Sequence, residues 1–193
     1  MHFSTIFAAT ALAGAAIAEE HFVAVSNKTG SLVFQPDNVK AAEGDTVTFR
    51  FWPKNHSVAQ GAFGSPCQPL DTGFWSGYVP TVDTQNVANW TFTYEVKNAS
   101  VPIWYYCTQG KHCQNGMVGV INGPASGAKT LEAYRNVSKN AENNVSPNSK
   151  AGTGGNLKDN STSTNLDTTG AASHLSGSLI FAGLAGTFAY LLM

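Results

Sequence analysis

The sequence predicts an all-β fold, a Greek-key β-sandwich or barrel, with a disordered C-terminal stalk. Short β-rich segments separated by turn residues lie between His21 and Asn122, which is typical of such folds. The chain has 193 residues, of which 42% are hydrophobic, so it can fill one core of ordinary size. Beyond Asn143 the composition becomes polar: 20 of the 31 residues from Asn143 to Ser173 are Ser, Thr, Asn or Gly, which predicts disorder.

Alternation of side chains identifies the strands. Phe22, Ala24 and Ser26 point to one face of the first predicted strand, and Val23 and Val25 point to the other. Similar alternation or β-rich runs predict strands at 47–51, 90–94, 103–107 and 117–121. The aromatic residues in and beside these segments are expected in the core: Phe49, Phe51, Trp52, Trp90, Trp104 and Tyr105.

The first 18 residues have the pattern of a secretory signal peptide. An apolar run from Ile6 ends in Ala16-Ile17-Ala18, a small-x-small cleavage motif, and the run is short for a bilayer span. A buried first helix is the alternative. We therefore expect the mature chain to begin at Glu19.

The C-terminus has the pattern of a GPI-attachment signal. Residues 179–193 are uncharged and mostly apolar, a polar spacer precedes them, and the small residues Gly170, Ala171 and Ala172 come before the spacer. We expect attachment at Gly170, with Ser173 and Asn165 as alternatives. A tail-inserted membrane helix is the competing interpretation.

Together these patterns predict the organisation of the chain. Leu131, Tyr134 and Val137 recur at every third residue, which predicts a short helix after the β-domain. The expected segments are a signal peptide at 1–18, a β-domain at 19–122, a helical extension at 123–142, a stalk at 143–170 and a removed GPI signal at 171–193. The protein is then expected on the extracellular face of the plasma membrane, or in the cell wall.

Charge and sequons agree with export. With 11 Lys and Arg against 12 Asp and Glu, the net charge is −1, and the absence of a basic patch argues against nucleic acid as a partner. Asn-x-Ser/Thr sequons predict N-glycans. We expect glycans at Asn27, Asn89, Asn98, Asn136, Asn144 and Asn160.

The three cysteines need an explanation, because an exported chain is expected to oxidise its thiols in pairs. They are Cys67, Cys107 and Cys113. One is left over, and a thiol survives outside the cell when it is buried or held by a metal.

A metal site accounts for the unpaired cysteine. Cys107, His112 and Met117 follow one another at intervals of five residues, between two predicted strands, and His56 follows the strand at 47–51. Two imidazoles, a thiolate and a weak axial thioether are the ligands of a type 1 copper site, whereas zinc gives no reason to select Met. If Cys107 binds copper, Cys67 and Cys113 are free to pair. A glycan at the seventh sequon, Asn55, would crowd His56, so we expect this sequon to be unused.

These motifs resemble the cupredoxins, and among them the phytocyanins. The run Trp104-Tyr105-Tyr106-Cys107, followed by His112-Cys113 and Met117, is similar to the phytocyanin ligand loop, and Asn55-His56-Ser57-Val58 is similar to the upstream ligand motif. The resemblance also implies a disulfide between Cys67 and Cys113. With the predicted export and anchor signals, the chain most resembles the fungal GPI-anchored cupredoxins.

The resemblance implies a monomeric protein with one type 1 copper ion that transfers single electrons to an unidentified redox partner at the cell surface. Copper acquisition or buffering with the same ligands is the first alternative, and a structural cell-wall module is the second. No nucleophile with a neighbouring base is evident, so we do not expect an enzyme.

His21 offers a different copper site. After cleavage behind Ala18 the chain would begin Glu19-Glu20-His21, and a free amine with His at the third position can bind Cu(II) in a square plane. The alternative, which we favour, is a surface histidine at the opening of the first strand.

Overall fold

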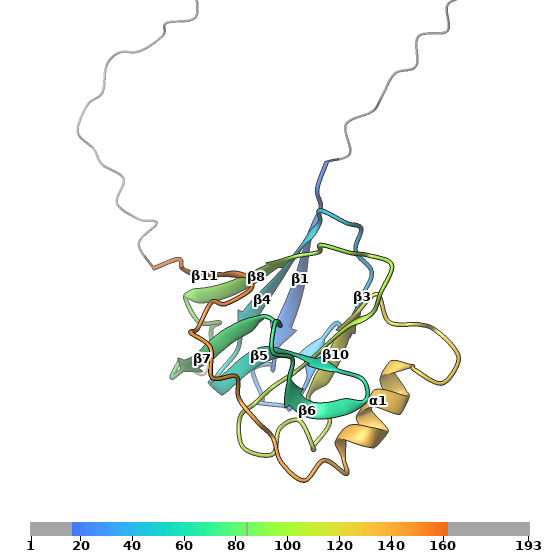
Figure 1. Cartoon of the computed structure of the whole chain (residues 1–193). Coiled ribbons are helices and arrows are strands. Elements are labelled where there is room, and N and C mark those ends of the chain that lie inside the picture. Colours follow the sequence, from blue (N-terminus) through green and yellow to red (C-terminus); the bar gives the residue numbers. More distant parts are fainter. Residues whose placement is uncertain (1–16, 84, 162–193) are drawn as a thin grey trace, which may run out of the picture. The chain divides into compact units, whose positions relative to one another are not determined.

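Strands dominate the computed structural model, which describes residues 17–83 and 85–161 (Figure 1). The predicted GPI signal with Gly170, and the predicted signal peptide except for its last two residues, lie outside this range. No helix within the range is both long and apolar enough to cross a bilayer.

The first sheet has five strands in the order β11-β8-β4-β1-β2. Its central strands β1 (Glu20–Val25) and β4 (Thr46–Phe51) run parallel, with Val23 opposite Phe49. The other three strands complete this sheet: β2 (Phe34–Gln35), β8 (Trp90–Glu95) and β11 (Asn156–Asp159).

The second sheet carries the predicted ligand region. Its order is β3-β10-β9-β5-β6, and β7 pairs with β5 off this path. The members are β3 (Asn38–Val39), β5 (Lys54–Ala62), β6 (Ser65–Pro69), β7 (Trp75–Thr81), β9 (Ile103–Tyr106) and β10 (Val118–Ile121). β9 lies between β5 and β10, so the segments before and after the predicted ligand loop are held in the middle of the sheet.

The two sheets enclose one core, which confirms the predicted all-β fold. Val47, Phe49 and Phe51 of β4 are fully buried, as their alternation predicts, and they pack with Tyr105, Cys107 and Met117 from the second sheet and its loop. One core therefore joins the centre of the sandwich to the predicted ligand loop.

A second, smaller core covers the other face of the second sheet. The helix α1 (Leu131–Ser138) confirms the predicted helical segment, and its Leu131 and Tyr134 pack with Trp104 and Cys113. Thr130 caps its N-terminus, because the hydroxyl oxygen accepts the backbone N–H of Ala133 at 3.2 Å.

One member of the predicted helical stripe is not buried. Val137 is 40% exposed, whereas Ser138 is buried and donates its hydroxyl to the backbone oxygen of Tyr134 at 2.7 Å. At 100° per residue, position 138 falls on the face of Leu131 and Tyr134, and position 137 does not. The spacing of three residues therefore predicted the helix correctly, but it predicted Val137 as the third buried residue where the structure has Ser138.

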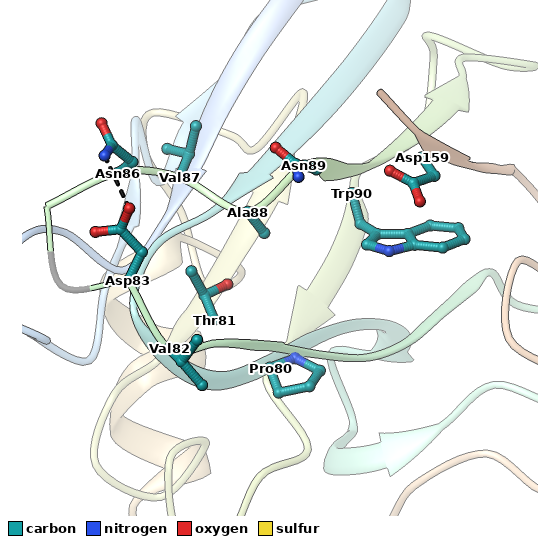
Figure 2. Close-up of a pocket in the computed structure, with 10 residues that line it drawn as sticks. All are labelled: Pro80, Thr81, Val82, Asp83, Asn86, Val87, Ala88, Asn89, Trp90 and Asp159. Carbon is teal, nitrogen blue, oxygen red and sulfur yellow. Dashed lines mark hydrogen bonds between the residues drawn. The ribbon is translucent and has the colours of Figure 1, made fainter. Parts of the chain in front are cut away.

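Two of the expected core aromatics lie at the surface instead. Trp90 is 42% exposed at the start of β8, where it lies opposite Asp159 of β11 and lines a pocket of about 470 Å³ (Figure 2). Trp52 is only partly buried, with the ammonium of Lys28 5.9 Å from its ring centre. Both residues lie at or beyond strand ends, where alternation no longer implies a facing sheet.

The prediction of disorder from Asn143 onward is wrong for residues 143–161. β11 pairs with β8 along four residues, from Asn156 opposite Thr93 to Asp159 opposite Trp90 (Figure 1). Backbone hydrogen bonds hold the preceding segment against Trp75 of β7. The nitrogen of Gly152 donates to the Trp75 oxygen, and the nitrogen of Trp75 donates to the Thr153 oxygen, at 2.8 Å each. Composition misses this order because it arises from backbone hydrogen bonds rather than from apolar side chains.

Candidate metal centre

His56, Cys107 and His112 come together at one end of the second sheet. Their ligand atoms all lie within 4.8 Å of one another. His56 belongs to β5, whereas Cys107 directly follows β9 and His112 lies in the loop that leads to β10. The pairing of β5 with β9 brings the upstream histidine to the loop that carries the other two residues.

The donors are close enough to share one ion. The Sγ atom of Cys107 lies 3.4 Å from Nδ1 of His112, and the two imidazole ring centres are 5.2 Å apart at an interplanar angle of 44°. His56 and Cys107 are fully buried, while His112 is partly exposed. The cluster therefore opens to solvent on the side of His112.

One nitrogen of His56 is left free for a ligand. Its Nε2 lies 3.1 Å from the backbone oxygen of Pro53, and a carbonyl can only accept, so Nε2 carries the hydrogen. Its Nδ1 is buried with no hydrogen-bond partner among the described residues. A buried nitrogen lone pair beside a thiol and a second imidazole is the arrangement that a soft, nitrogen-preferring metal requires, so the residues present fit copper.

The protonation states also suit metal binding. Burial is the largest cause that lowers the pKa of His56 to about 4, followed by repulsion between His56 and His112 when both carry a proton. The hydrogen bond to Pro53 raises the pKa, and the charge of Lys54 lowers it by the smallest effect. Burial likewise lowers the pKa of His112. Both imidazoles are therefore neutral donors at neutral pH. Burial raises the pKa of the Cys107 thiol, so the metal-free thiol keeps its proton, and a metal would have to displace this proton to bind the sulfur.

Ser57 and Thr108 surround the sulfur, and sequence reasoning did not assign either residue to the site. The Ser57 hydroxyl lies 3.8 Å from Sγ of Cys107, and it accepts the backbone N–H of Thr108 at 2.9 Å. The two side-chain hydroxyls are also 2.9 Å apart. Their positions directly after His56 and Cys107 in the sequence were the available signal.

Met117 is fully buried beside the ligand loop. The backbone nitrogen of Cys107 donates to Met117 oxygen at 3.1 Å, and the nitrogen of Met117 donates to His112 oxygen at 2.9 Å. These two bonds join the ends of the ligand loop at Cys107 and Met117 and tie Met117 to His112. Met117 as the axial ligand stays a prediction.

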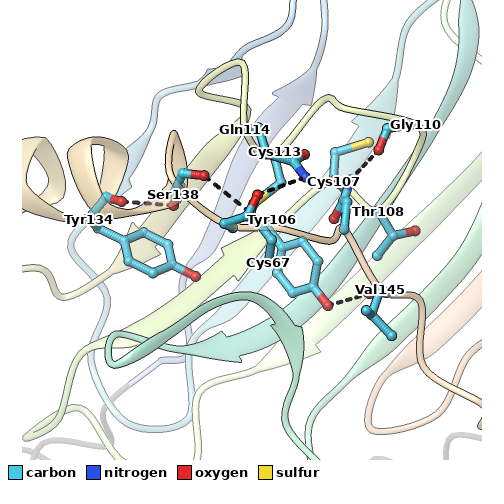
Figure 3. Close-up of a disulfide and its surroundings, with 12 residues drawn as sticks. Cys67, Tyr106, Cys107, Thr108, Gly110, Cys113, Gln114, Tyr134, Ser138 and Val145 are labelled. Atoms are coloured by element: carbon cyan, nitrogen blue, oxygen red, sulfur yellow. Dashed lines mark hydrogen bonds between the residues drawn. A yellow bond between two sulfur atoms is a disulfide. The ribbon is translucent and has the colours of Figure 1, made fainter.

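The disulfide joins Cys67 to Cys113, with the Cα atoms 5.8 Å apart (Figure 3). Cys107 is the free cysteine and is buried. The bond connects β6 to the residue that follows His112, so it ties the ligand loop to the edge of the second sheet. Tyr134 and Ser138 of α1 lie on the same side of the sheet (Figure 3).

Two of the sequon asparagines contact the ligand loop. Asn55 donates its Nδ2 to the side-chain oxygen of Gln109 at 3.0 Å, which supports an unused sequon there. Asn144 donates Nδ2 to the backbone oxygens of Cys107 and Gly110, at 3.0 Å each. A glycan on Nδ2 would leave one hydrogen for these two bonds, and the glycan at Asn144 stays a prediction.

Asn160 is a further sequon asparagine whose Nδ2 makes two hydrogen bonds. It is exposed, and its Nδ2 donates to Asn89 oxygen at 2.9 Å and to the Thr91 hydroxyl at 3.1 Å, so a glycan there would also leave one hydrogen for two bonds, but away from the ligand loop. The glycans at Asn27, Asn89, Asn98, Asn136 and Asn160 stay predictions.

His21 lies near the start of β1, and copper binding by a cleaved Glu19-Glu20-His21 terminus stays a prediction, because Ala18 precedes Glu19 in the described chain. Its Nε2 lies 3.1 Å from Oδ2 of Asp45, and Oδ1 of Asp45 accepts the backbone N–H of Glu19 at 2.8 Å. Glu19, His21 and Asp45 thus form a second cluster of possible metal ligands. Asp45 already accepts hydrogen bonds from both other members, which accounts for the cluster without an ion.

Comparison with known proteins gives two relatives. Over 142 residues the chain is 38% identical to the probable GPI-anchored cupredoxin-1 of Arthroderma benhamiae, covering 74% of this chain and 71% of the relative. Over 144 residues it is 41% identical to an extracellular serine-rich protein of the same organism, covering 74% of this chain but 54% of that relative, so the chain spans about half of its length. No family model matches the chain.

Solved structures that are similar to this chain include a purple cupredoxin from Nitrosopumilus maritimus. It has 19% identity and a TM-score of 0.40, and the match covers 52% of this chain and 96% of that one. A pseudoazurin from Hyphomicrobium denitrificans has 22% identity and a TM-score of 0.37, covering 62% of this chain and 94% of that one.

Proposed function

The chain belongs to the cupredoxin family of its Arthroderma benhamiae relative, and on this basis we propose that it carries single electrons on one type 1 copper ion. The proposed ligands are His56, Cys107, His112 and Met117. The observation that carries the proposal is the buried, unpartnered Nδ1 of His56, in a cluster where His56, Cys107 and His112 each offer a ligand atom within 4.8 Å of the others.

The protein's own residues hold these donors in place before a metal arrives. The Pro53 carbonyl orients the His56 ring, Ser57 fixes the backbone after Cys107, and the disulfide restrains the loop at Cys113. A site that does not rearrange between two oxidation states lowers the barrier to electron transfer. Copper with a thiolate and two imidazoles supplies a reversible one-electron couple.

His112 is the ligand through which electrons are proposed to enter and leave. It is partly exposed, whereas His56 and Cys107 are fully buried. Deep burial of two ligands also favours a resident ion over one that is delivered, because release would require opening of the loop. This favours electron transfer over copper acquisition.

The proposed location is the extracellular side of the cell surface. The relative's name includes a GPI anchor, and the second relative is named as extracellular. The apolar N-terminal run with its cleavage motif, and the small residues and uncharged tail at the C-terminus, support the same location.

The test is the visible and EPR spectrum of the secreted protein with Cu(II). We expect an intense thiolate-to-copper band at one ion per chain, reversible bleaching by a mild reductant, and loss of the band in Cys107→Ser. His21→Gln is the matched control and keeps the band. A spectrum without the intense band, or one that Cys107→Ser leaves unchanged, contradicts the proposal.

A further inference from the structure

The segment between α1 and β11, residues 139–155, crosses the outer face of the second sheet, and we call it the strap. Val145 anchors its middle, because its backbone nitrogen donates to Cys67 oxygen at 3.0 Å and its oxygen accepts the Tyr106 hydroxyl at 2.6 Å (Figure 3). Ser146 adds a hydrogen bond of 2.7 Å with the Tyr78 hydroxyl. The strap is thus fixed to β6, β7 and β9 around one point.

Asn144 lies directly before this anchor and reaches the ligand loop. Its Nδ2 donates one hydrogen to the oxygen of Cys107 and the other to the oxygen of Gly110, both at 3.0 Å. The two carbonyls lie three residues apart, on either side of the turn that begins the loop (Figure 3). One planar amide therefore sets the separation of these two backbone groups.

The position of His112 depends on the same turn. The backbone nitrogen of His112 donates to Gln109 oxygen at 2.9 Å, so the residues between the two carbonyls hold a proposed copper ligand. Gly110 has a φ of 47°, in the left-handed region, so the turn does not have ordinary helical or extended geometry at this residue.

We propose that Asn144 is a positioning residue of the metal centre: its side-chain amide clamps the ligand loop between Cys107 and Gly110, and it therefore carries no glycan although it lies in a sequon. The assignment rests on the proposed copper function for its spectroscopic consequences. The clamp itself exists without copper, so it is testable on the metal-free protein.

Glycosylation and the clamp are mutually exclusive. A glycan bonded to Nδ2 replaces one of its two hydrogens, so one of the two carbonyls loses its donor. We expect the Asn144 peptide of the secreted protein to be unmodified by mass spectrometry, and a glycan at Asn144 would overturn the assignment.

Two variants separate the effect of the hydrogen bonds from that of the sequon. Both variants lose the sequon, so a difference between them reports on the side-chain chemistry at position 144. Asn144→Ala removes both donors. Asn144→Asp keeps the shape but turns a carboxylate towards two carbonyl oxygens, which repel it. Asn143→Ala is the matched control, since Asn143 is exposed and precedes the clamp. In every measurement below we expect the smallest effect on the ligand loop in Asn143→Ala, which should behave like wild type. The effect should be larger in Asn144→Ala and largest in Asn144→Asp.

The first measurement uses the metal-free protein. Backbone amide exchange at His112 is expected to be faster in both Asn144 variants than in wild type and the control. Unchanged exchange in Asn144→Asp would overturn the clamp, whether or not the protein binds copper.

The second measurement uses the copper-loaded protein. We expect the dissociation constant for copper to rise about 10-fold or more, as for other residues that orient metal ligands. The reduction potential should fall, and more in Asp than in Ala, because lost N–H dipoles and an added negative charge both favour the oxidised ion. A wild type without copper binding would reject the proposed function but not the clamp, whereas an unchanged potential in both variants would reject Asn144 as a positioning residue.

Discussion

The Nε2 atom of His56 donates a hydrogen bond to the backbone oxygen of Pro53, 3.1 Å away and three residues earlier in the chain. The bond selects one tautomer, so that the lone pair lies on the buried and unpartnered Nδ1 of a ring that clusters with Cys107 and His112. Because Pro53 lies in the short turn between β4 and β5, the fold itself decides which nitrogen is available for a metal.

The first prediction concerns the stability of the metal-free protein in mild acid. The pKa of His56 is about 4 in the folded chain, against 6.5 for an ordinary histidine, so between these pH values the unfolded chain binds the extra proton. The free energy of unfolding should therefore fall by roughly 3 kcal/mol as the pH drops from 7 to 4. Urea denaturation at several pH values measures this.

His56→Gln and His21→Gln are the matched variants for this prediction. Removal of His56 should flatten most of the slope between pH 6.5 and 4, while removal of His21 should leave that contribution in place. The lowered pKa of His112 acts in the same direction and accounts for a residual slope. An identical slope in wild type and His56→Gln would show that His56 does not titrate as described.

The second prediction concerns the disulfide. Cys67 and Cys113 are 46 residues apart, and closure of such a loop contributes about 4 kcal/mol in the chain-entropy treatment. The double variant Cys67→Ala/Cys113→Ala should lose about this much stability in urea denaturation while it keeps the intense copper band, because Cys107 is untouched. Loss of the band in a variant that remains folded would show that the copper site needs the disulfide or one of its cysteines.

The candidate site could be predicted from the sequence because its information is local and strongly constrained. Cys107, His112 and Met117 lie on one loop between two strands, and an odd cysteine in an exported chain demands a reason. His56 is distant in sequence, and the motif around it identified it. The pairing of β5 with β9 then brings it to the loop.

The strap and β11 could not be predicted in this way. Their residues are Ser, Thr, Asn and Gly, which carry no hydrophobic period, and their order depends on backbone groups of β6, β7 and β8. Asn144 looks like a glycosylation site in the sequence, because a sequon does not show which distant backbone groups the asparagine amide contacts. Long-range backbone pairing has no signature in composition.

The third prediction tests the contact between Gly119 and Tyr105, which lie opposite one another on β10 and β9. A Cβ atom at Gly119 would overlap the Tyr105 ring, and that ring is fully buried in the core. Gly119→Ala should therefore cost about 2 kcal/mol, as overpacking of cores does. Gly64→Ala, where no atom lies within 4 Å, is the control and should be close to neutral. Equal melting temperatures for the two variants would contradict the tight packing.

The fourth prediction compares two buried tyrosines. The hydroxyl of Tyr134 is buried without a hydrogen-bond partner among the described residues, whereas the hydroxyl of Tyr106 donates to Val145 oxygen at 2.6 Å. Tyr134→Phe keeps the ring contacts with Trp104 and Phe63 and should raise stability by about 1 kcal/mol. Tyr106→Phe should lower it by about 1 kcal/mol, because the strap loses an anchor. Thermal unfolding of both variants gives the sign, and destabilisation by Tyr134→Phe would indicate a partner for this hydroxyl.

The last prediction compares chains that end at residues 161, 155 and 142. The chain 19–161 contains every described strand and should unfold like the longer protein. Removal of β11 in 19–155 exposes the backbone edge of β8 and the partly buried Leu157 contact, so both melting temperature and solubility should fall. The chain 19–142 also lacks Asn144 and Val145, so it should lose copper affinity in addition. If 19–142 matched 19–161 in both stability and copper affinity, residues 143–161 would be the dispensable stalk that their composition predicts.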